Sequence, residues 1–294
     1  MERVKFGRTE SLVSPMGVGT YYDFTWIAPA KILRIKKGAE RKVDAIKAAL
    51  DSGINFIDTA EIYETEPLVA RAVKDMEREK LFIATKVWPI HFSYDGVIKS
   101  CNRSLKKLNM KYIDLYQLHF GSNPKKIKEA LRAMEYLVDQ GKIRHIGISN
   151  FDINQTKEAV SSLKKHELAS TQMNFNVSHR NIEKDIIPYC KENGIAVLAY
   201  YPLAHGVLTE ELPETKNVLK TIEKNHGKKT APQIALNWFM SKYDFVFPIP
   251  RASNPDHVRE NAGSMGWKMS QEEIEMLENS VKTLKGPTWS GDKT

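Results

Sequence analysis

Features common in other protein classes are scarce or missing in this chain of 294 residues. Its two cysteines, Cys101 and Cys190, are too few for a disulfide framework, which favours a reducing compartment. No apolar run approaches the roughly 20 residues that a membrane helix needs. The charged start, MERVKFGRTESLV, lacks the apolar core of a signal peptide. We therefore expect a cytoplasmic protein that does not associate with a membrane.

The motifs of several enzyme classes are also missing. No Gly-rich dinucleotide loop follows a strand-like run and no P-loop is present, since GTY at 19–21 has too few glycines. The histidines show no metal-ligand spacing and have no cysteine nearby, so we expect no metal ion. Ser93 and Ser149 lack the context of a nucleophile elbow. Hydrolase and zinc-enzyme interpretations are therefore weak.

Lysine and arginine outnumber aspartate and glutamate, 44 against 36, which gives a net charge of +8. The densest basic stretch, KILRIKKGAERK at 31–42, has neither aromatic stacking residues nor a nucleic-acid-binding module beside it. We interpret this stretch as a solvated loop and helix start, and we expect no nucleic-acid partner. A modest basic excess also suits an enzyme whose ligand carries phosphates.

Short apolar runs typical of strands alternate with helix-like segments along the chain. After a hairpin at 3–6 and 10–13, we expect strands at 16–19, 54–58, 81–87, 112–119, 143–149, 170–176, 195–202 and 244–250. We expect helices near 39–52, 66–74, 96–108, 125–140, 150–164, 182–193 and 231–241, and two more near 255–263 and 271–284. This alternation predicts parallel strands joined by right-handed crossovers. Eight repeats in this length favour an α/β fold, a (β/α)8 TIM barrel with an N-terminal β-hairpin and two extra C-terminal helices, as one domain over 1–294.

Four polar residues lie at the ends of consecutive strand-like runs: Asp58 and Tyr63 in IDTAEIY, Lys86 in FIATK, and His119 in IDLYQLH. In a parallel barrel the carboxyl ends of the strands meet at one mouth, where catalytic groups gather. A free phenol has a pKa of about 10. A neighbouring ammonium lowers that pKa, and a carboxylate holds the ammonium in place. A neutral histidine can orient a substrate oxygen. Each residue alone is more often structural, but together they predict a metal-free site that donates a proton to a carbonyl.

The chain resembles the aldo-keto reductase family over nearly its whole length. The motifs that carry the resemblance occur in the family's order: VSPMGVGT, IDTAEIY, ATKVWP, LYQLH, IRHIGISNF, QMNFNV, LAYYPLAHGVL and FPIPRASNPDHVREN. The resemblance implies a (β/α)8 barrel that binds NADP(H) in an extended pose without a Rossmann fold. It also implies that Asp58, Tyr63, Lys86 and His119 form the catalytic tetrad.

The resemblance further implies where the ligands bind. Ser149, Asn150 and Gln172 match positions that bind the nicotinamide carboxamide, and Tyr200 matches the aromatic residue that stacks on the ring. The implied cofactor-binding residues are Gly19, Thr20, Tyr21, Asp58, Ser149, Asn150, Gln172, Tyr200, Pro202, Leu203, Gly206, Leu208, Ile249, Pro250, Arg251, Ser253, Asn254, His257, Glu260 and Asn261. The implied substrate pocket contains Tyr21, Trp26, Trp88 and His119, with Trp26 in the long first loop closing over it.

Several residues depart from the commonest family patterns. Arg251 falls where the family often has lysine or glycine, and Ala252 and His257 replace frequent polar or cationic residues. Guanidinium and ammonium groups are the donors that bind a 2′-phosphate best. Arg251 supplies a guanidinium; the alternative is that Arg251 is a solvated surface charge. NADP(H) is therefore favoured, with NAD(H) possible. Glu64 replaces a frequent glycine after the tyrosine and either reshapes the mouth or points into water.

The leading hypothesis is a stand-alone NADP(H)-dependent enzyme that reduces aldehydes and ketones to alcohols, with alcohol dehydrogenase or carbonyl reductase activity. The alternative is a cofactor-binding regulatory subunit of the same fold that acts through a membrane partner. The absence of a long N-terminal extension favours the enzyme. The SNF, QMN and AYYPL motifs argue against a third hypothesis, a (β/α)8 isomerase or lyase that uses no nicotinamide. We expect a small-molecule carbonyl substrate and a monomer or weak homo-oligomer; the physiological substrate and the preferred direction stay open.

Overall fold

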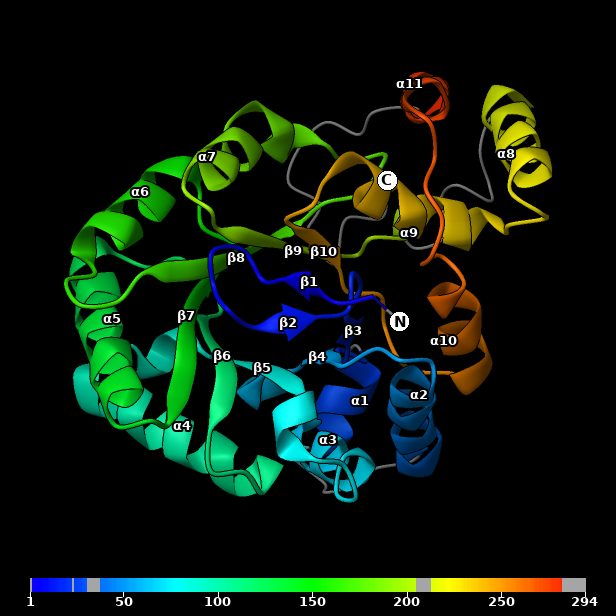
Figure 1. The fold of residues 1–294 in the computed structure, drawn as a ribbon. Helices are drawn as coiled ribbons and strands as arrows, with labels where there is room; N and C mark the ends of the chain where they lie inside the picture. Colours follow the sequence, from blue (N-terminus) through cyan, green and yellow to red (C-terminus); the bar gives the residue numbers. More distant parts are fainter. Residues whose placement is uncertain (1, 23, 31–37, 205–212, 282–294) are drawn as a thin grey trace.

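The computed structural model describes residues 2–22, 24–30, 38–204 and 213–281, and within them eight parallel strands form a barrel (Figure 1). Neighbouring strands in the sheet are also consecutive in the chain. The strands are β3 (Val18–Gly19), β4 (Phe56–Asp58), β5 (Phe82–Val87), β6 (Ile113–Leu118), β7 (Ile143–Ser149), β8 (Leu168–Asn174), β9 (Ala196–Tyr200) and β10 (Val246–Pro248). The predicted barrel architecture is therefore confirmed.

A short run of backbone hydrogen bonds joins the first strand to the last and nearly closes the barrel. On one side β3 pairs with β4. On the other side the N–H groups of Gly17 and Gly19 donate to the carbonyl oxygens of Pro248 and Pro250, at 3.0 and 2.9 Å. We call this contact the seam.

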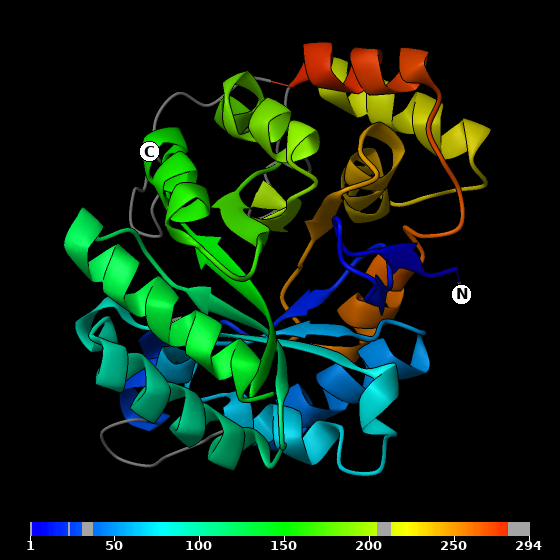
Figure 2. The same ribbon diagram turned by 60° about the vertical axis from the view of Figure 1, so that its left-hand side comes forward.

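Helices lie between the strands and surround the barrel (Figures 1 and 2). They are α1 (Phe24–Ala28), α2 (Ala39–Asp51), α3 (Glu66–Ala72), α4 (Tyr94–Leu108), α5 (Pro124–Asp139), α6 (Ile153–Ser162), α7 (Ile186–Glu192), α8 (Pro213–Asn225), α9 (Ala231–Lys242), α10 (Pro255–Ala262) and α11 (Gln271–Ser280). Local sequence explains several of their ends. Ser93 and Asp152 cap the N-termini of α4 and α6 with their side chains, and Gly53 adopts a left-handed φ of 83° just beyond α2.

The two predicted C-terminal helices, α10 and α11, are present and occupy different places. Helix α10 packs against α2 and α9 and completes the ring around the barrel. Helix α11 lies beside α8, outside that ring (Figures 1 and 2). The sequence did not predict α8, because its polar segment PETKNVLKTIEKN buries only a narrow stripe of Thr215, Leu219 and Ile222.

The N-terminal hairpin covers the amino-terminal end of the barrel (Figure 1). Its strands β1 (Val4–Lys5) and β2 (Leu12–Val13) pair antiparallel. Phe6, in the turn, is fully buried, and its ring centroid lies 4.7 Å from that of Phe82 and 5.3 Å from that of Phe247. Burying one such side chain contributes roughly 1.5–3 kcal/mol. Because side chains fill this end, the candidate chemistry falls to the opposite, carboxyl-terminal end.

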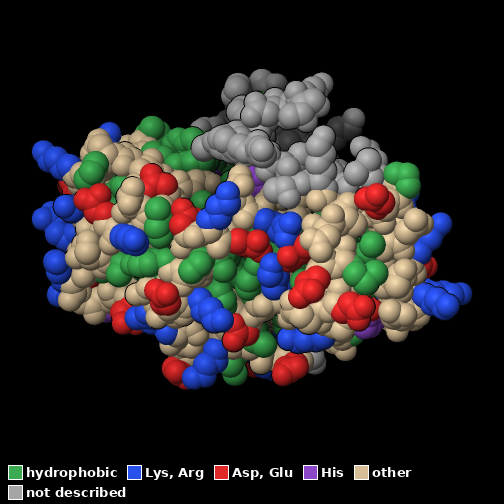
Figure 3. Space-filling model, turned by 90° about the horizontal axis from the view of Figure 1, so that it is seen from above, with side chains coloured by type: hydrophobic (Ala, Val, Ile, Leu, Met, Phe, Trp, Pro, Cys, Tyr) green, Lys and Arg blue, Asp and Glu red, His purple; other side chains and the backbone are tan. Residues whose placement is uncertain are grey.

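Four further features bear on membrane, metal and cysteine sites: the surface charge, the helix lengths, the metal-ligating side chains and the thiols. Charged side chains of both signs are interspersed on the face shown in Figure 3. Within the described ranges, none of the helices is both long and apolar enough to cross a bilayer. In the same ranges no group of three or more His, Cys, Asp or Glu is placed to hold a metal ion. Burial raises the pKa of both thiols, Cys101 and Cys190, to about 12, which makes them poor nucleophiles. Residues 31–37 of the basic stretch lie outside the described residues.

Candidate active site

Three adjacent strand ends carry the predicted tetrad. Strand β4 ends at Asp58, and the 3₁₀ turn η2 (Glu61–Tyr63) follows it and carries Tyr63. Lys86 lies near the end of β5, and His119 directly follows β6. These strands are parallel neighbours, so their carboxyl ends bring the four side chains to one place.

Lys86 and Asp58 form a buried ion pair. Nζ of Lys86 lies 2.5 Å from Oδ2 of Asp58 and 2.9 Å from the carbonyl oxygen of Thr59, and the two charged side chains are 0% and 4% exposed. The other carboxylate oxygen, Oδ1, accepts hydrogen bonds from Gln172 and Gln117 at 2.9 and 3.2 Å. Burial lowers the pKa of Lys86, and the charge of Asp58 opposes that shift. Both carboxylate oxygens thus have partners that compensate for the loss of water.

Tyr63 and His119 form the other half of the tetrad. Oη of Tyr63 lies 3.1 Å from Nε2 of His119, and Nζ of Lys86 lies 5.1 Å from the centroid of the Tyr63 ring. Burial raises the pKa of Tyr63 well above 10, and the negative charge of Asp58 adds to this shift. Burial also lowers the pKa of His119 well below 6.5, assisted by Lys86.

The raised pKa of Tyr63 differs from the sequence-based expectation that Lys86 would lower it. Lys86 donates to Asp58 and to Thr59, so much of its charge is already compensated. Burial then has the larger effect on the phenol. At neutral pH this arrangement holds a protonated phenol beside a neutral imidazole, which is a pair suited to donating a proton and a hydrogen bond to the same oxygen.

Polar side chains and an aromatic ring gather at the ends of β7, β8 and β9. Asn150, with a left-handed φ of 60°, donates to Oγ of Ser149 at 3.0 Å and accepts from Oη of Tyr200 at 2.8 Å. Oγ of Ser149 donates to the carbonyl oxygen of Gln172 at 3.1 Å. The structure thus brings together the four residues predicted to bind a nicotinamide. Amide and hydroxyl groups beside a flat ring suit a planar ligand that carries a carboxamide.

The residues predicted for the adenosine end lie at the seam and on α10. Arg251 pairs with Gly19 in a parallel bridge, and its side chain is exposed. Asn254 is the N-cap of α10 and accepts from the N–H of Asp256 at 3.2 Å. A helix N-terminus favours anions. The structure places the other predicted residues as follows: Thr20, Pro202, Ile249, Pro250 and Asn261 are buried, Leu203, Ser253 and Glu260 are half-buried, and His257 is exposed. Gly206 and Leu208 lie outside the described residues.

Aromatic side chains surround the Tyr63–His119 pair. The ring centroid of Tyr21 lies 5.1 Å from that of Tyr63, and the ring of Trp88 meets His119 edge-on at 5.2 Å. Phe120 stacks on the imidazole at 5.0 Å. Tyr21 and Trp88, both predicted as pocket residues, are half-buried beside the tetrad.

Trp26 is placed differently from the expectation that it closes over the pocket. Its side chain is only 5% exposed, and its indole N–H donates to the backbone carbonyl of Tyr63 at 3.1 Å. Nζ of Lys42 lies over its ring at 4.5 Å. In this structure Trp26 supports the backbone of the Tyr63 turn from within the fold, and a short helix, α1, holds it there.

The sequence did not identify several residues of the site. Gln117 bonds Asp58 from β6, and Phe120 covers the face of His119. Glu61 accepts from the backbone N–H of Trp88 at 2.5 Å. Gln117 lies two residues after Leu115 on β6, so both side chains point into the barrel. An amide at such an inward-facing position could have marked Gln117 as a site residue from the sequence alone. A single glutamate in a turn carries no such signal.

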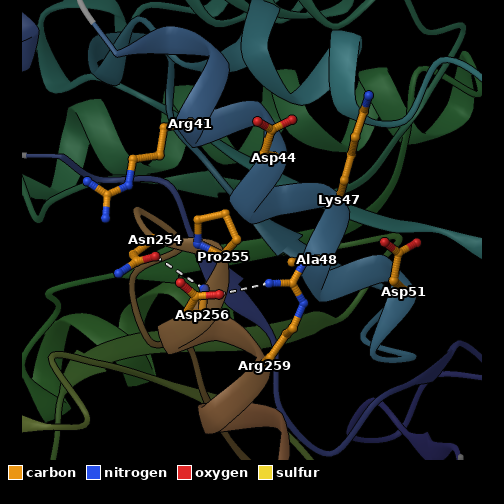
Figure 4. Close-up of a pocket in the computed structure, with 9 residues that line it drawn as sticks. All are labelled: Arg41, Asp44, Lys47, Ala48, Asp51, Asn254, Pro255, Asp256 and Arg259. Atoms are coloured by element: carbon orange, nitrogen blue, oxygen red, sulfur yellow. Dashed lines mark hydrogen bonds and ion pairs between the residues drawn. The ribbon is translucent and has the colours of Figure 1, made fainter.

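A surface groove of about 550 Å³ lies apart from the tetrad, between α2 and the start of α10 (Figure 4). Its lining residues are Arg41, Asp44, Lys47, Ala48, Asp51, Asn254, Pro255, Asp256 and Arg259. Three basic and three acidic side chains balance in it, and Asp256 bonds Arg259 at 3.0 Å. The groove touches the predicted cofactor site only at Asn254 and contains none of the tetrad.

Comparisons with known proteins find one family among the relatives of this chain. A model described as the aldo/keto reductase family matches residues 34–282. Methylglyoxal reductase YeaE of Escherichia coli K12 is 35% identical over 251 residues, which covers 84% of this chain and 87% of the relative. Glyoxal reductase of Bacillus subtilis 168 is 32% identical over 249 residues, covering 84% of this chain and 86% of the relative.

Solved structures show the same architecture. A thermostable aldo-keto reductase, Tm1743, in complex with the inhibitor epalrestat superposes with a TM-score of 0.83 at 36% identity, covering 95% of this chain and 99% of that one. An aldo-keto reductase from Klebsiella pneumoniae in complex with NADPH gives a TM-score of 0.83 at 28% identity, covering 98% of this chain and 97% of that one.

Proposed function

This chain belongs to the aldo/keto reductase family, and we propose that it reduces aldehydes and ketones to alcohols with NADP(H), using Tyr63 as the proton donor. Oxidoreduction of carbonyl compounds follows from the family. The observation that carries the finer proposal is the 3.1 Å contact between Oη of Tyr63 and Nε2 of His119, next to the buried Lys86–Asp58 pair.

The charge states of the tetrad support these roles. The raised pKa keeps the Tyr63 phenol protonated, and the lowered pKa keeps His119 neutral, so both can face a carbonyl oxygen without an opposing charge. As hydride reaches the carbonyl carbon, negative charge grows on the oxygen. The Tyr63 proton neutralises that charge, and Lys86 stabilises the resulting phenolate from nearby. Asp58 holds the lysine in place throughout.

The donor set fits a nicotinamide cofactor. When bound, NADPH supplies the hydride. Ser149, Asn150 and Gln172 would hold its carboxamide and Tyr200 would offer the adjoining flat surface, a role supported by the hydrogen bonds that join these residues. The K. pneumoniae neighbour binds NADPH, which supports the same choice here. Arg251, exposed beside the α10 N-terminus, is the residue that we propose to contact a 2′-phosphate.

The proposed substrates are small neutral aldehydes with a second carbonyl, such as methylglyoxal and glyoxal. Two relatives carry the names of reductases of these compounds. The aromatic side chains around the reacting groups, Tyr21, Trp88 and Phe120, are uncharged and favour compact neutral molecules over charged ones.

Replacing Tyr63 with phenylalanine tests the proposal. Wild-type protein mixed with NADPH and methylglyoxal should oxidise the cofactor, followed by its absorbance. Tyr63→Phe should lower kcat by at least roughly 100-fold, because the general acid is lost. The Kd for NADPH, measured by quenching of tryptophan fluorescence, should stay close to that of the wild type.

The controls separate the possible failures. Near-wild-type turnover by Tyr63→Phe would rule out Tyr63 as the proton donor. An intact wild-type protein that binds NADPH but turns over no aldehyde or ketone would favour the regulatory-subunit alternative. Turnover by the purified chain alone would oppose that alternative.

A further inference from the structure

One face of helix α4 is directed at the turn that carries Tyr63. Ser100, Arg103 and Lys107 are spaced at i, i+3 and i+7, so they line one side of the helix. Each contacts one of the two glutamates that flank Tyr63 in EIYE. We call the five residues Glu61, Glu64, Ser100, Arg103 and Lys107 the α4 clamp.

Glu61 makes most of the contacts in the α4 clamp. Its side chain is 11% exposed, and Oε1 accepts from the backbone N–H of Trp88 at 2.5 Å and lies 2.9 Å from Nδ1 of His91. Oε2 accepts a short hydrogen bond from Oγ of Ser100 and lies 3.5 Å from the guanidinium of Arg103. Arg103 also donates to Oγ of Ser100 at 2.9 Å. One carboxylate therefore ties three segments together: the Tyr63 turn, the segment after Lys86, and α4.

Glu64 fixes the other end of the turn. It adopts a left-handed φ of 56°, which a residue with a side chain rarely occupies, and Oε1 lies 3.4 Å from Nζ of Lys107. The sequence left open whether Glu64 reshapes the mouth or points into water; the structure shows its side chain 20% exposed and paired with Lys107 of α4. This pair is partly exposed and contributes less than the Glu61 contacts.

The turn itself has few internal restraints. It is a single 3₁₀ turn of three residues, with the N–H of Tyr63 bonded to the carbonyl of Ala60 at 3.1 Å. The contact of Tyr63 with His119 depends on where this short turn sits relative to β5 and β6. Glu61 sets that position through the N–H of Trp88, whose ring also packs against His119. Proton transfer is sensitive to displacements on the order of 1 Å.

We propose that Glu61 is a positioning residue for carbonyl reduction: through the α4 clamp it sets the place of the Tyr63 hydroxyl and of Trp88 relative to His119. This inference rests on the proposed function, because it concerns the alignment of Tyr63 as the proton donor. Glu61 does not touch the reacting atoms and acts through Tyr63 and Trp88.

The test compares single-turnover rates of NADPH oxidation by methylglyoxal. Glu61→Ala should lower the rate about 10-fold or more, with the Kd for NADPH changed less than about 2-fold. Glu61→Gln keeps an acceptor for Trp88 and should lose less. Ser100→Ala, which removes one contact with a small change in volume, should lose about 2- to 5-fold. The solvent deuterium isotope effect should rise in each slowed variant, because proton transfer from a misplaced phenol becomes limiting.

Glu135→Gln is the matched control. Glu135 is a buried carboxylate that accepts from the backbone N–H groups of Lys164, Lys165 and His166, in the segment before β8. Its replacement should lower Tm without changing the rate or the isotope effect of the folded protein. This separates loss of a buried carboxylate from loss of alignment.

Each outcome of these measurements either supports the positioning role of Glu61 or overturns it. A Glu61→Ala rate within about 2-fold of wild type, or a slower rate with an unchanged isotope effect, overturns the inference. Where Glu61→Ala does not fold, an unchanged rate in Ser100→Ala overturns it. Lack of turnover in the wild type refutes the proposed function itself, and this result is distinct because it precedes any comparison of variants.

Discussion

Replacement of Lys86 with methionine separates the chemical and structural consequences of the buried ion pair. Methionine is unbranched and uncharged, and it fills most of the space of lysine because it is only one heavy atom shorter. The substitution removes the ammonium that lies 2.5 Å from Oδ2 of Asp58. Among the described residues, it leaves that buried carboxylate with the side chains of Gln117 and Gln172 as donors. We expect two effects, one on the rate and one on the free energy of unfolding.

The structural effect follows from burial. Both side chains are at most 4% exposed, so the remaining carboxylate cannot recover water when its partner is removed. Breaking a buried ion pair in this way costs about 3–5 kcal/mol. For a protein of this size that corresponds to a fall in Tm on the order of 10 °C. The chemical effect is loss of carbonyl reduction, because Tyr63 loses the cation that stabilises its phenolate.

The assay combines urea denaturation, followed by circular dichroism, with NADPH oxidation in the presence of methylglyoxal. The double variant Asp58→Asn/Lys86→Met removes both charges, so it should recover most of the lost stability. It should stay inactive. Lys5→Met removes an exposed partner of Glu10, 3.0 Å away, and should change neither quantity much.

Two results would refute the reasoning. A Lys86→Met protein whose free energy of unfolding stays within about 1 kcal/mol of wild type would show that the pair is not a desolvated one. Retention of both the rate and its pH profile would show that Lys86 has no chemical role.

Two further predictions concern other parts of the chain. Arg251→Ala should weaken NADP(H) binding by roughly 1.5–3 kcal/mol and NAD(H) binding far less, measured by fluorescence titration; an equal loss for both would exclude contact with the 2′-phosphate. Burial lowers the pKa of His145 to about 4, so the unfolded chain takes up its proton first as pH falls. Wild-type stability should therefore drop by about 1.4 kcal/mol per pH unit more than that of His145→Gln between about pH 6.5 and 4. Identical slopes in denaturation at several pH values would contradict this.

The barrel was predictable from the sequence because its strands are short apolar runs. In β5 and β6, for example, every residue is buried, so neither face of the strand needs to be polar. Runs such as FIATK and IDLYQLH fix where β5 and β6 end, and so fix the places of Lys86 and His119. Helix α8 was not predictable in the same way. The alternation of strands and helices is complete without it. Its narrow apolar stripe has a packing partner only in the folded structure, where α11 lies beside it.

The site was predictable in its residue types and less so in its electrostatics. The sequence places an acid, an amine and a phenol at neighbouring strand ends, but the direction of the Tyr63 pKa shift depends on burial, which only the packed structure supplies. The placement of Trp26 was not predictable for the same reason. A tryptophan in a long loop can point into the mouth of the barrel or pack inside the protein, and only the structure shows that Trp26 is buried. The contacts of Glu61 come from segments that no local pattern links.

The seam has a consequence for how the chain is made. During synthesis from the N-terminus, β3 can pair with β4 early, but the carbonyls of Pro248 and Pro250 that complete it lie at the end of β10 and just beyond it, and β10 is made after the other seven barrel strands. Until then one side of β3 is an open edge, and open edges invite pairing with other chains. Its length of two residues limits that hazard. Closure of the barrel is thus a late, long-range step, and ordering of Gly19 should coincide with the arrival of residues 248–252.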